Sequence, residues 1–296
     1  MYHALILLSV VMFGGGFALN EQYRKKRGDS LSVSLEFSAI GATAGFFILL
    51  AANRFRIECT PFTLVMALLS TLLSIGYTFF SFKAFQYVNL SLYSLFSMLG
   101  GMALPFLQGI LFYNEGITVA KALCFAFILA ALLLTVEKGK GKAGIGYCLG
   151  VFVLNGMSGV LSKLFTSLPY EKASATGYSL MIAICTAILS LVLLFVLLAA
   201  KRRSGEEKGS AAIGKPTAVC AAVGAANGVI NRVANLLLVI ALAHVQASVQ
   251  YPMVTGGVII VSTAIAFFGK SKPSKRELCS VVLAFAGLMI LFLLPF

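Results

Sequence analysis

The sequence of 296 residues has no tryptophan and little charge, with only 11% of its residues being Asp, Glu, Lys or Arg. Soluble domains carry about 25% charged residues. This deficit, together with 59% hydrophobic residues, excludes an ordinary soluble enzyme, a disordered chain and a coiled coil. Cysteine is scarce too, and the six cysteines form no C-x-x-C pair. We therefore expect no disulfide framework, no metal site and no cofactor.

Acidic residues are fewer than basic ones, 10 against 23, which gives a net charge of +13. A basic chain can bind nucleic acid, but here the cations form short clusters between long uncharged runs. Basic clusters that flank apolar runs report the orientation of membrane spans. This pattern excludes nucleic acid and predicts an integral, multi-pass protein of the plasma membrane, with the lipid bilayer as its surroundings.

Long apolar runs are what the sequence does have. A helix crosses the hydrocarbon with about 20 apolar residues, and ten such runs predict an all-α membrane protein with ten transmembrane helices. The first run has no basic segment before it and no small-residue cleavage site after it, so we expect a span and not a signal peptide. The expected spans are 2–20, 33–52, 61–83, 90–112, 118–136, 144–164, 175–199, 216–243, 247–268 and 275–294.

The distribution of Lys and Arg predicts how these spans are oriented. Most of them lie in the connections that follow odd-numbered spans, in clusters at 24–27, 138–142, 201–215 and 270–276. The positive-inside rule places these connections in the cytoplasm. Both termini are therefore expected outside.

The two halves of the chain resemble each other. Residues 84–91 (AFQYVNLS) align with residues 241–248 (ALAHVQAS), and the Gly pair at 100–101 aligns with the pair at 256–257. Each half, 1–137 and 138–296, holds five spans, so the second half must enter the membrane upside down. Inverted repeats are typical of secondary transporters, which bind substrate near the membrane midplane between the halves.

A known family is visible in the best-conserved part of this repeat. Its features are the joint at 87–91, the Gly100-Gly101 pair with Pro105, and Asn114-Glu115-Gly-Ile-Thr118 after the fourth span; a second copy runs over 241–293. These segments resemble the EamA-type domain of the drug/metabolite transporter superfamily. The resemblance implies transport of a small molecule by alternating access.

Two features depart from the family pattern. The second copy has Lys270-Ser271 where the first has Glu115. Family members are expected to have both termini in the cytoplasm, whereas the charge pattern here predicts them outside. A proton or a counter-substrate is the candidate coupling partner, and the expected state is a monomer or a homodimer.

Polar side chains recur every four residues in two spans that the repeat relates. Such spacing advances about 40° per step on an α-helix, so each set forms one slowly winding stripe. For the stripe made of hydroxyl side chains, the alternative is a structural role in which each hydroxyl donates to a carbonyl of its own helix. The two stripes are Asn227, Asn231 and Asn235 with Arg232, and Ser70, Ser74 and Thr78.

Arg232 lies near the centre of its span. An arginine there costs about 2.5–3.5 kcal/mol, so we expect it to face a polar cavity or a partner. We predict that Arg232 binds a substrate carboxylate or phosphate, with the three Asn side chains on other polar groups. The alternative is a structural Arg tied to Asn side chains and helix carbonyls. The family resemblance adds four cavity-lining candidates, Tyr77, Ser97, Asn155 and Tyr251.

Acidic residues are missing from the deep parts of every span. Proton-coupled multidrug transporters of this superfamily use a membrane-embedded carboxylate to exchange protons for cationic drugs. The only deep charge here is positive, which favours anionic or zwitterionic metabolites such as amino acids, exported or exchanged. A proton-coupled exporter of organic cations is the alternative.

An enzyme is a further alternative. Gly156-Met-Ser158-Gly159 matches the G-x-S-G motif of intramembrane serine proteases, with His244 as the candidate base. Catalysis would need that base within hydrogen-bond reach of Ser158. Four letters match easily by chance in a chain rich in Gly and Ser, and an inverted ten-span repeat is foreign to that class. We therefore expect no enzymatic activity.

Overall fold

The structure is a computed structural model that describes residues 2–88, 90–113, 116–135, 142–204, 216–268 and 275–294. Within these ranges the chain forms ten α-helices and no strand. They are α1 (Tyr2–Arg27), α2 (Leu31–Ala52), α3 (Pro61–Tyr87), α4 (Leu90–Tyr113), α5 (Val119–Thr135), α6 (Lys142–Ser167), α7 (Ala175–Ser204), α8 (Ala218–Leu242), α9 (Ala247–Phe268) and α10 (Lys275–Leu293). Each predicted span coincides with one of them, so the prediction of ten helices is confirmed.

Some sequence features fall outside the described residues. The predicted boundary between the halves lies within 136–141, and Asn114, Glu115, Lys270 and Ser271 of the family motif are also among the residues that are not described.

Seven helices are long and apolar enough to cross a membrane: α1, α2, α3, α6, α7, α8 and residues 96–113 of α4. Shorter apolar segments occur in α5, α9 and α10. Large apolar side chains cover the outside of the molecule, with Phe47 62%, Phe112 77% and Phe195 75% exposed. Helices that satisfy their own backbone and carry an apolar exterior are what a bilayer accepts. The protein is an all-α, multi-pass membrane protein.

Capping residues define where several helices begin. Ser30, Thr60 and Thr217 each accept a hydrogen bond from the backbone N–H three residues later, at 3.2–3.3 Å. Pro61 occupies the first position of α3, where its missing N–H costs nothing. The polar caps therefore separate consecutive apolar runs into distinct helices.

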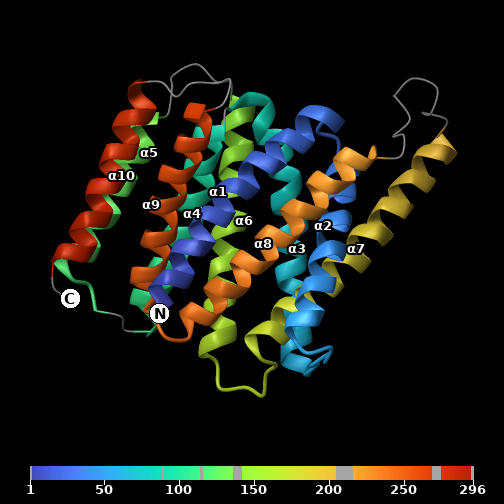
Figure 1. Cartoon of the computed structure of the whole chain (residues 1–296), viewed down its shortest axis with the longest axis horizontal. Helices are drawn as coiled ribbons and strands as arrows, with labels where there is room; N and C mark the ends of the chain where they lie inside the picture. Colours follow the sequence, from blue (N-terminus) through green and yellow to red (C-terminus); the bar gives the residue numbers. More distant parts are fainter. Residues whose placement is uncertain are drawn as a thin grey trace.

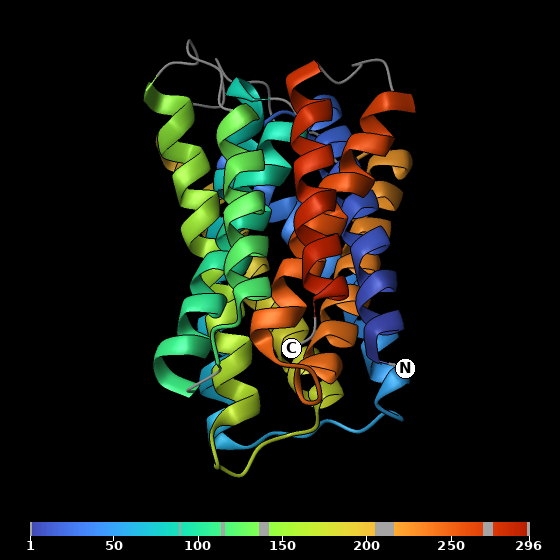
Figure 2. The same ribbon diagram turned by 90° about the vertical axis from the view of Figure 1, so that its left-hand side faces the viewer.

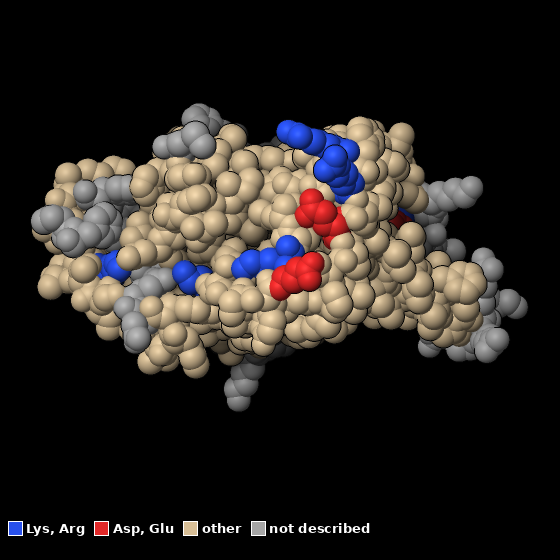
Figure 3. Space-filling model, turned by 90° about the horizontal axis from the view of Figure 1, so that it is seen from below, with Lys and Arg blue, Asp and Glu red and all other residues tan. Residues whose placement is uncertain are grey.

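The helices run between two ends of the molecule (Figure 1). The connections at 53–60, 168–174 and 243–246 lie at the end that also carries both chain termini, which we call the termini end. Charged side chains are few on this face, and acidic and basic ones lie beside each other (Figure 3). Helices α5 and α10 pack together along one edge, seen face-on in Figure 2, and α7 lies along the opposite edge.

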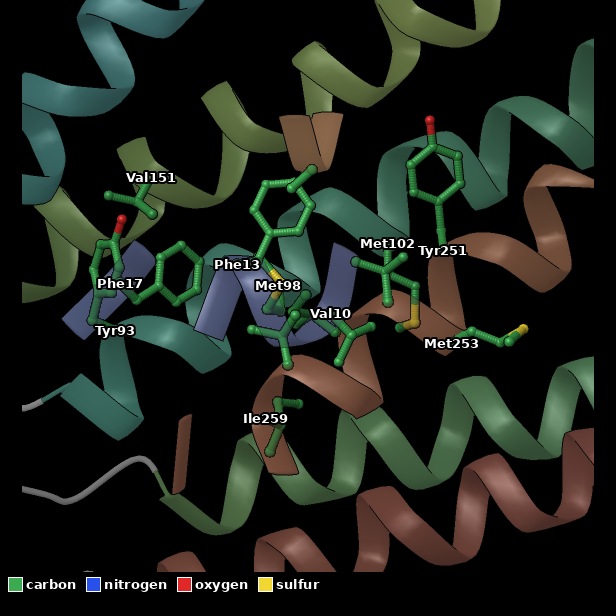
Figure 4. Packing of buried hydrophobic residues seen from close by; sticks show 14 of the residues in the cluster. Val10, Phe13, Phe17, Tyr93, Met98, Met102, Val151, Tyr251, Met253 and Ile259 are labelled. Carbon is green, nitrogen blue, oxygen red and sulfur yellow. The ribbon is translucent and has the colours of Figure 1, made fainter. Parts of the chain in front are cut away.

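The largest apolar core joins α1, α4 and α9. Figure 4 shows Phe13 and Phe17 of α1 beside Tyr93 and Met98 of α4, with Ile259 of α9 on the other side of α1. Tyr93 and Ile259 are almost fully buried. This core fixes the helices that form one side of the central space.

Two glycine pairs bring α2 and α8 into backbone contact. The side-chain position of Gly228 is occupied by the backbone of Gly41, so a Cβ there would overlap it. Likewise, a Cβ on Gly45 would lie 2.6 Å from Cγ of Arg232. The G-x-x-x-G spacing of both helices therefore permits close packing, and it also makes room for the Arg232 side chain.

Candidate functional site

A cavity of about 230 Å³ lies in the middle of the bundle. Its wall is formed by eight helices, α1 to α4 and α6 to α9, and by no described residue of α5 or α10. Aromatic and apolar side chains such as Phe13, Phe17 and Leu73 alternate in it with Asn, Ser, Thr and Tyr. An apolar cavity with a few convergent polar groups is typical of a small-molecule site.

Most of the residues that the sequence singled out lie in this wall. Nine of the eleven are Arg232, Asn227, Asn231 and Asn235 on α8, Ser74, Tyr77 and Thr78 on α3, Asn155 on α6 and Tyr251 on α9. Ser97 lies behind the wall, where its hydroxyl is 2.8 Å from the Tyr77 hydroxyl and accepts from Asn155 Nδ2 at 3.3 Å. Ser70, the first residue of the α3 stripe, lies away from the cavity and bonds the Tyr178 hydroxyl of α7 at 2.8 Å.

The α8 stripe is ordered by hydrogen bonds along its helix. Asn227 donates to the Gly16 carbonyl of α1 at 2.6 Å. Asn231 donates to the carbonyl and the side-chain oxygen of Asn227, both at 2.9 Å, and Asn235 donates to the Asn231 carbonyl at 2.8 Å. Each of the three side-chain amides thus gives at least one of its two N–H groups to an oxygen of the protein, and Asn227 Oδ1 is itself an acceptor for Asn231.

Arg232 is the charged residue of the wall. Its Nη2 donates to Thr186 Oγ1 on α7 at 3.0 Å, and its stem lies against Gly45. Among the described residues the ion pairs are Lys25–Glu21 and Arg27–Glu36, and neither involves Arg232. A cation in the interior of a membrane protein without an acidic partner is costly, because its desolvation is not offset. The guanidinium therefore remains available to an anionic group in the cavity.

Thr186 is a site residue that the sequence analysis missed. It is buried, donates to its own helix carbonyl at Ile182 (2.6 Å), and lies 3.3 Å from the Thr71 hydroxyl of α3. Its hydroxyl thus joins Arg232 to α7 and α3 at once. A threonine within an apolar helix gives no signal of this role, because back-bonding to the helix is its ordinary behaviour.

The tyrosine side of the cavity is already hydrogen-bonded within the protein. Tyr93 donates to the Tyr77 hydroxyl at 2.7 Å, and Ser81 is 2.8 Å from the Tyr93 hydroxyl. Tyr251 donates to the Gly159 carbonyl of α6 at 3.0 Å. These contacts hold α3 to α4 and α9 to α6. They also fix the positions of the Tyr77 and Tyr251 rings in the wall.

Acidic side chains are absent from the described wall of the cavity. Glu36 is buried, but it accepts from Tyr23 at 2.5 Å and from Arg27 at 2.7 Å and lies outside the wall. No group of three or more His, Cys, Asp or Glu that could hold a metal occurs among the residues that the structure describes.

Ser158 and His244, the two residues of the protease hypothesis, make contacts with different parts of the molecule. Ser158 faces the cavity, and its carbonyl accepts from the Ser162 hydroxyl at 3.0 Å. His244 stacks on the Tyr2 ring with centroids 4.1 Å apart. No hydrogen bond of the described residues joins Ser158 to His244.

Comparison with known proteins yields a fold and no family. The sequence matches no family profile and no curated protein. A solved crystal structure, described only as that of a protein, is similar with a TM-score of 0.63 and 16% sequence identity, over 97% of each chain. At this identity the likeness shows a shared fold along nearly the whole chain.

Proposed function

We propose that this chain is a secondary transporter of the drug/metabolite superfamily that carries small anionic or zwitterionic metabolites, such as amino acids, across the plasma membrane as an exporter or exchanger. The observation that carries the proposal is Arg232, a cation in the wall of a central cavity with no acidic partner in the described structure. Ionisable residues inside a membrane protein mark substrate pathways by default. A guanidinium binds carboxylates and phosphates in a bidentate manner.

The packing of the helices supports an inverted repeat as the basis of this transport. If α1 to α5 correspond to α6 to α10, the pairs α1–α8 and α6–α3 are the same contact made twice, as are α2–α8 and α7–α3. The pairs α2–α7, α4–α9 and α5–α10 would each lie on the pseudo-two-fold axis, and all three are in contact. Alternating access then follows from rocking of the two halves about the central cavity.

The wall of the cavity disfavours the cation-exporting alternative. Exchange of protons for organic cations needs a carboxylate that both can reach, and the described wall contains none. Glu36, the buried carboxylate, is neutralised by Arg27. The protease alternative lacks support because Ser158 and His244 make separate contacts.

The basic clusters favour a cytoplasmic location for the connections that follow the odd-numbered helices. The termini end would then lie outside the cell. A proton or a counter-substrate remains the proposed coupling partner, with a monomer or a homodimer as the functional unit.

The proposal is tested by transport into proteoliposomes with wild type and Arg232→Gln. Removing a hydrogen-bonded charge partner costs about 1.5–3 kcal/mol, so uptake of an anionic or zwitterionic metabolite should require at least about tenfold more substrate. Lys83→Gln is the matched control, because Lys83 is a half-buried cation of α3 that lies outside the cavity wall. Equal transport by Arg232→Gln and wild type would refute the proposal.

A further inference from the structure

Besides Arg232, the cavity wall contains a second polar side chain that the structure marks, because one of its atoms has no hydrogen-bond partner among the described residues. Gln250, in the first turn of α9, is 1% exposed and lies in the cavity wall. Its side-chain oxygen Oε1 is buried and has no hydrogen-bond partner within the described structure. Buried polar atoms are nearly always paired, so an unpaired acceptor in a cavity wall points to a donor that the cavity receives.

The orientation of the Gln250 amide is fixed by its neighbour. Nε2 donates to the Leu238 carbonyl of α8 at 3.0 Å. A carbonyl can only accept, so exchanging the nitrogen and the oxygen would place two acceptors against each other. The oxygen is therefore the atom of this side chain that is left without a partner.

Gln250 and Arg232 lie within reach of one small molecule. Leu238, which holds Gln250, follows Arg232 by six residues, or about 9 Å along the axis of α8. Both side chains are long and both line the same cavity. A substrate whose anionic group is bound at Arg232 can thus present a second group to Gln250 Oε1.

Other acceptors accompany Gln250 in this wall. Pro105 has no N–H to give to the Gly101 carbonyl one turn earlier, and Gly101 lines the cavity. On α8, Asn231 donates to the backbone carbonyl and the side-chain oxygen of Asn227, and Asn235 gives one of its two N–H groups to the Asn231 carbonyl. The Gly101 carbonyl of α4 and Gln250 Oε1 of α9 are therefore acceptors, which suit a ligand that brings N–H or O–H donors.

We propose that Gln250 determines specificity: its Oε1 accepts a hydrogen bond from an amino or hydroxyl group of the substrate, so that the cavity selects acids that carry such a donor over plain acids. This inference rests on the proposed function and narrows its substrate class. The anionic group is bound by Arg232, and the donor is bound by Gln250.

The test compares acids that share a carbon skeleton and differ only in the donor. Purified protein is titrated with alanine, lactate and propionate, with leucine, 2-hydroxy-4-methylpentanoate and 4-methylpentanoate, and with phenylalanine, phenyllactate and 3-phenylpropionate. The shift in unfolding temperature against concentration gives each affinity. In wild type, the amino or hydroxy acid of at least one set should bind about tenfold more tightly than the unsubstituted acid.

Two variants test whether Gln250 causes this preference. Gln250→Met should bind the unsubstituted acid as wild type does and lose the preference. Gln108→Met is the control, because Gln108 of α4 also has a buried, unpaired Oε1 but lies outside the cavity wall, and it should keep the preference. If Gln250→Met does not fold, Gln250→Leu serves instead: it also removes the acceptor without placing an oxygen against the Leu238 carbonyl, so it should lose the preference as well.

The outcomes separate this inference from the proposed function. The inference is overturned if no set shows a preference in wild type, if nothing binds, or if Gln250→Met keeps the preference. If the preference survives in Gln250→Met while Arg232→Gln abolishes binding, only the inference about Gln250 is contradicted, and the proposed function stands. Binding that is unchanged in Arg232→Gln contradicts the proposed function.

Discussion

Helix α8 turns its stripe of Asn227, Asn231 and Asn235 to the central cavity, whereas α3 divides its stripe between the cavity and a neighbouring helix. Ser74 and Thr78 of α3 line the cavity, but Ser70 bonds Tyr178 of α7. The same spacing of polar residues therefore serves two ends. On α8 it lines the cavity, and on α3 it also forms an interhelical bond.

The contacts of the two helices with their neighbours differ in the same way. Helix α8 meets α2 through glycine backbones at Gly41 and Gly228. Helix α3 meets α7 through side chains, with the Thr71 and Thr186 hydroxyls 3.3 Å apart. Close glycine packing on α8 leaves space for Arg232 beside Gly45, and the proposed repeat relates Arg232 to the apolar Ile75 of α3. Arg232 thus makes the α8 side the charged side of the cavity wall.

The largest effect is expected from breaking the glycine contact of α8. Gly228→Ala places a Cβ on the backbone of Gly41, and the helices must separate. We expect a loss of about 3 kcal/mol or more in the free energy of unfolding, measured by thermal unfolding in detergent. Gly15→Ala, with nothing within 4 Å of its Cβ, is the control and should be neutral or stabilising. Equal stability of the two variants would mean that α2 and α8 do not touch as described.

An intermediate effect is expected from truncating one polar side chain on each helix. Asn227→Ala removes two buried hydrogen bonds, the one to the Gly16 carbonyl and the one that Oδ1 accepts from Asn231, and should cost about 1–3 kcal/mol. Ser70→Ala, at the position of α3 that the proposed repeat relates to Asn227, removes one bond between two hydroxyls and should cost about 1 kcal/mol. Unfolding temperatures of the two variants measure the difference. The comparison between the helices is wrong if Ser70→Ala is the more damaging change.

The smallest effect concerns the connection that leads into α3. Glu58 accepts from the Ser174 backbone N–H at 2.6 Å, and this hydrogen bond lowers the pKa of its carboxyl group. A lowered pKa in the folded protein stabilises it above the ordinary carboxyl pKa, and this stabilisation is lost as the pH falls through the folded pKa. Glu58→Gln should therefore reduce the loss of stability on acidification.

The pH dependence of the unfolding temperature measures this effect. Glu171→Gln is the control, because the Glu171 carboxylate makes no hydrogen bond within the described residues. If the unfolding temperatures of the two variants depend on pH in the same way, the hydrogen bond between Glu58 and Ser174 does not stabilise the connection that leads into α3.

Much of this architecture was predictable from the sequence, and what could not be predicted has a physical reason. Ten apolar runs separated by caps such as Thr60 and Thr217 predict ten helices, because hydropathy and capping are local properties. The intramembrane Arg232 pointed to the cavity, because a buried cation needs a polar environment. How each helix is rotated in the bundle is not local. Ser70 and Thr186 therefore lay on faces that spacing alone did not distinguish.

The same reason explains why Gln250 was not among the site residues predicted from the sequence. Its importance depends on one hydrogen bond to Leu238 of another helix and on an oxygen that this bond leaves unused. No pattern within α9 marks that arrangement.

The central claim is that Arg232 binds the anionic group of the substrate, and ligand-induced stabilisation of the purified protein tests it most directly. A panel of amino acids, organic acids, phosphorylated metabolites and organic cations is added to wild type and Arg232→Gln, and the unfolding temperature is measured. Our account predicts that an anionic or zwitterionic compound stabilises wild type and that Arg232→Gln loses this stabilisation. Stabilisation by cations alone, or by the same anions in both proteins, would contradict it.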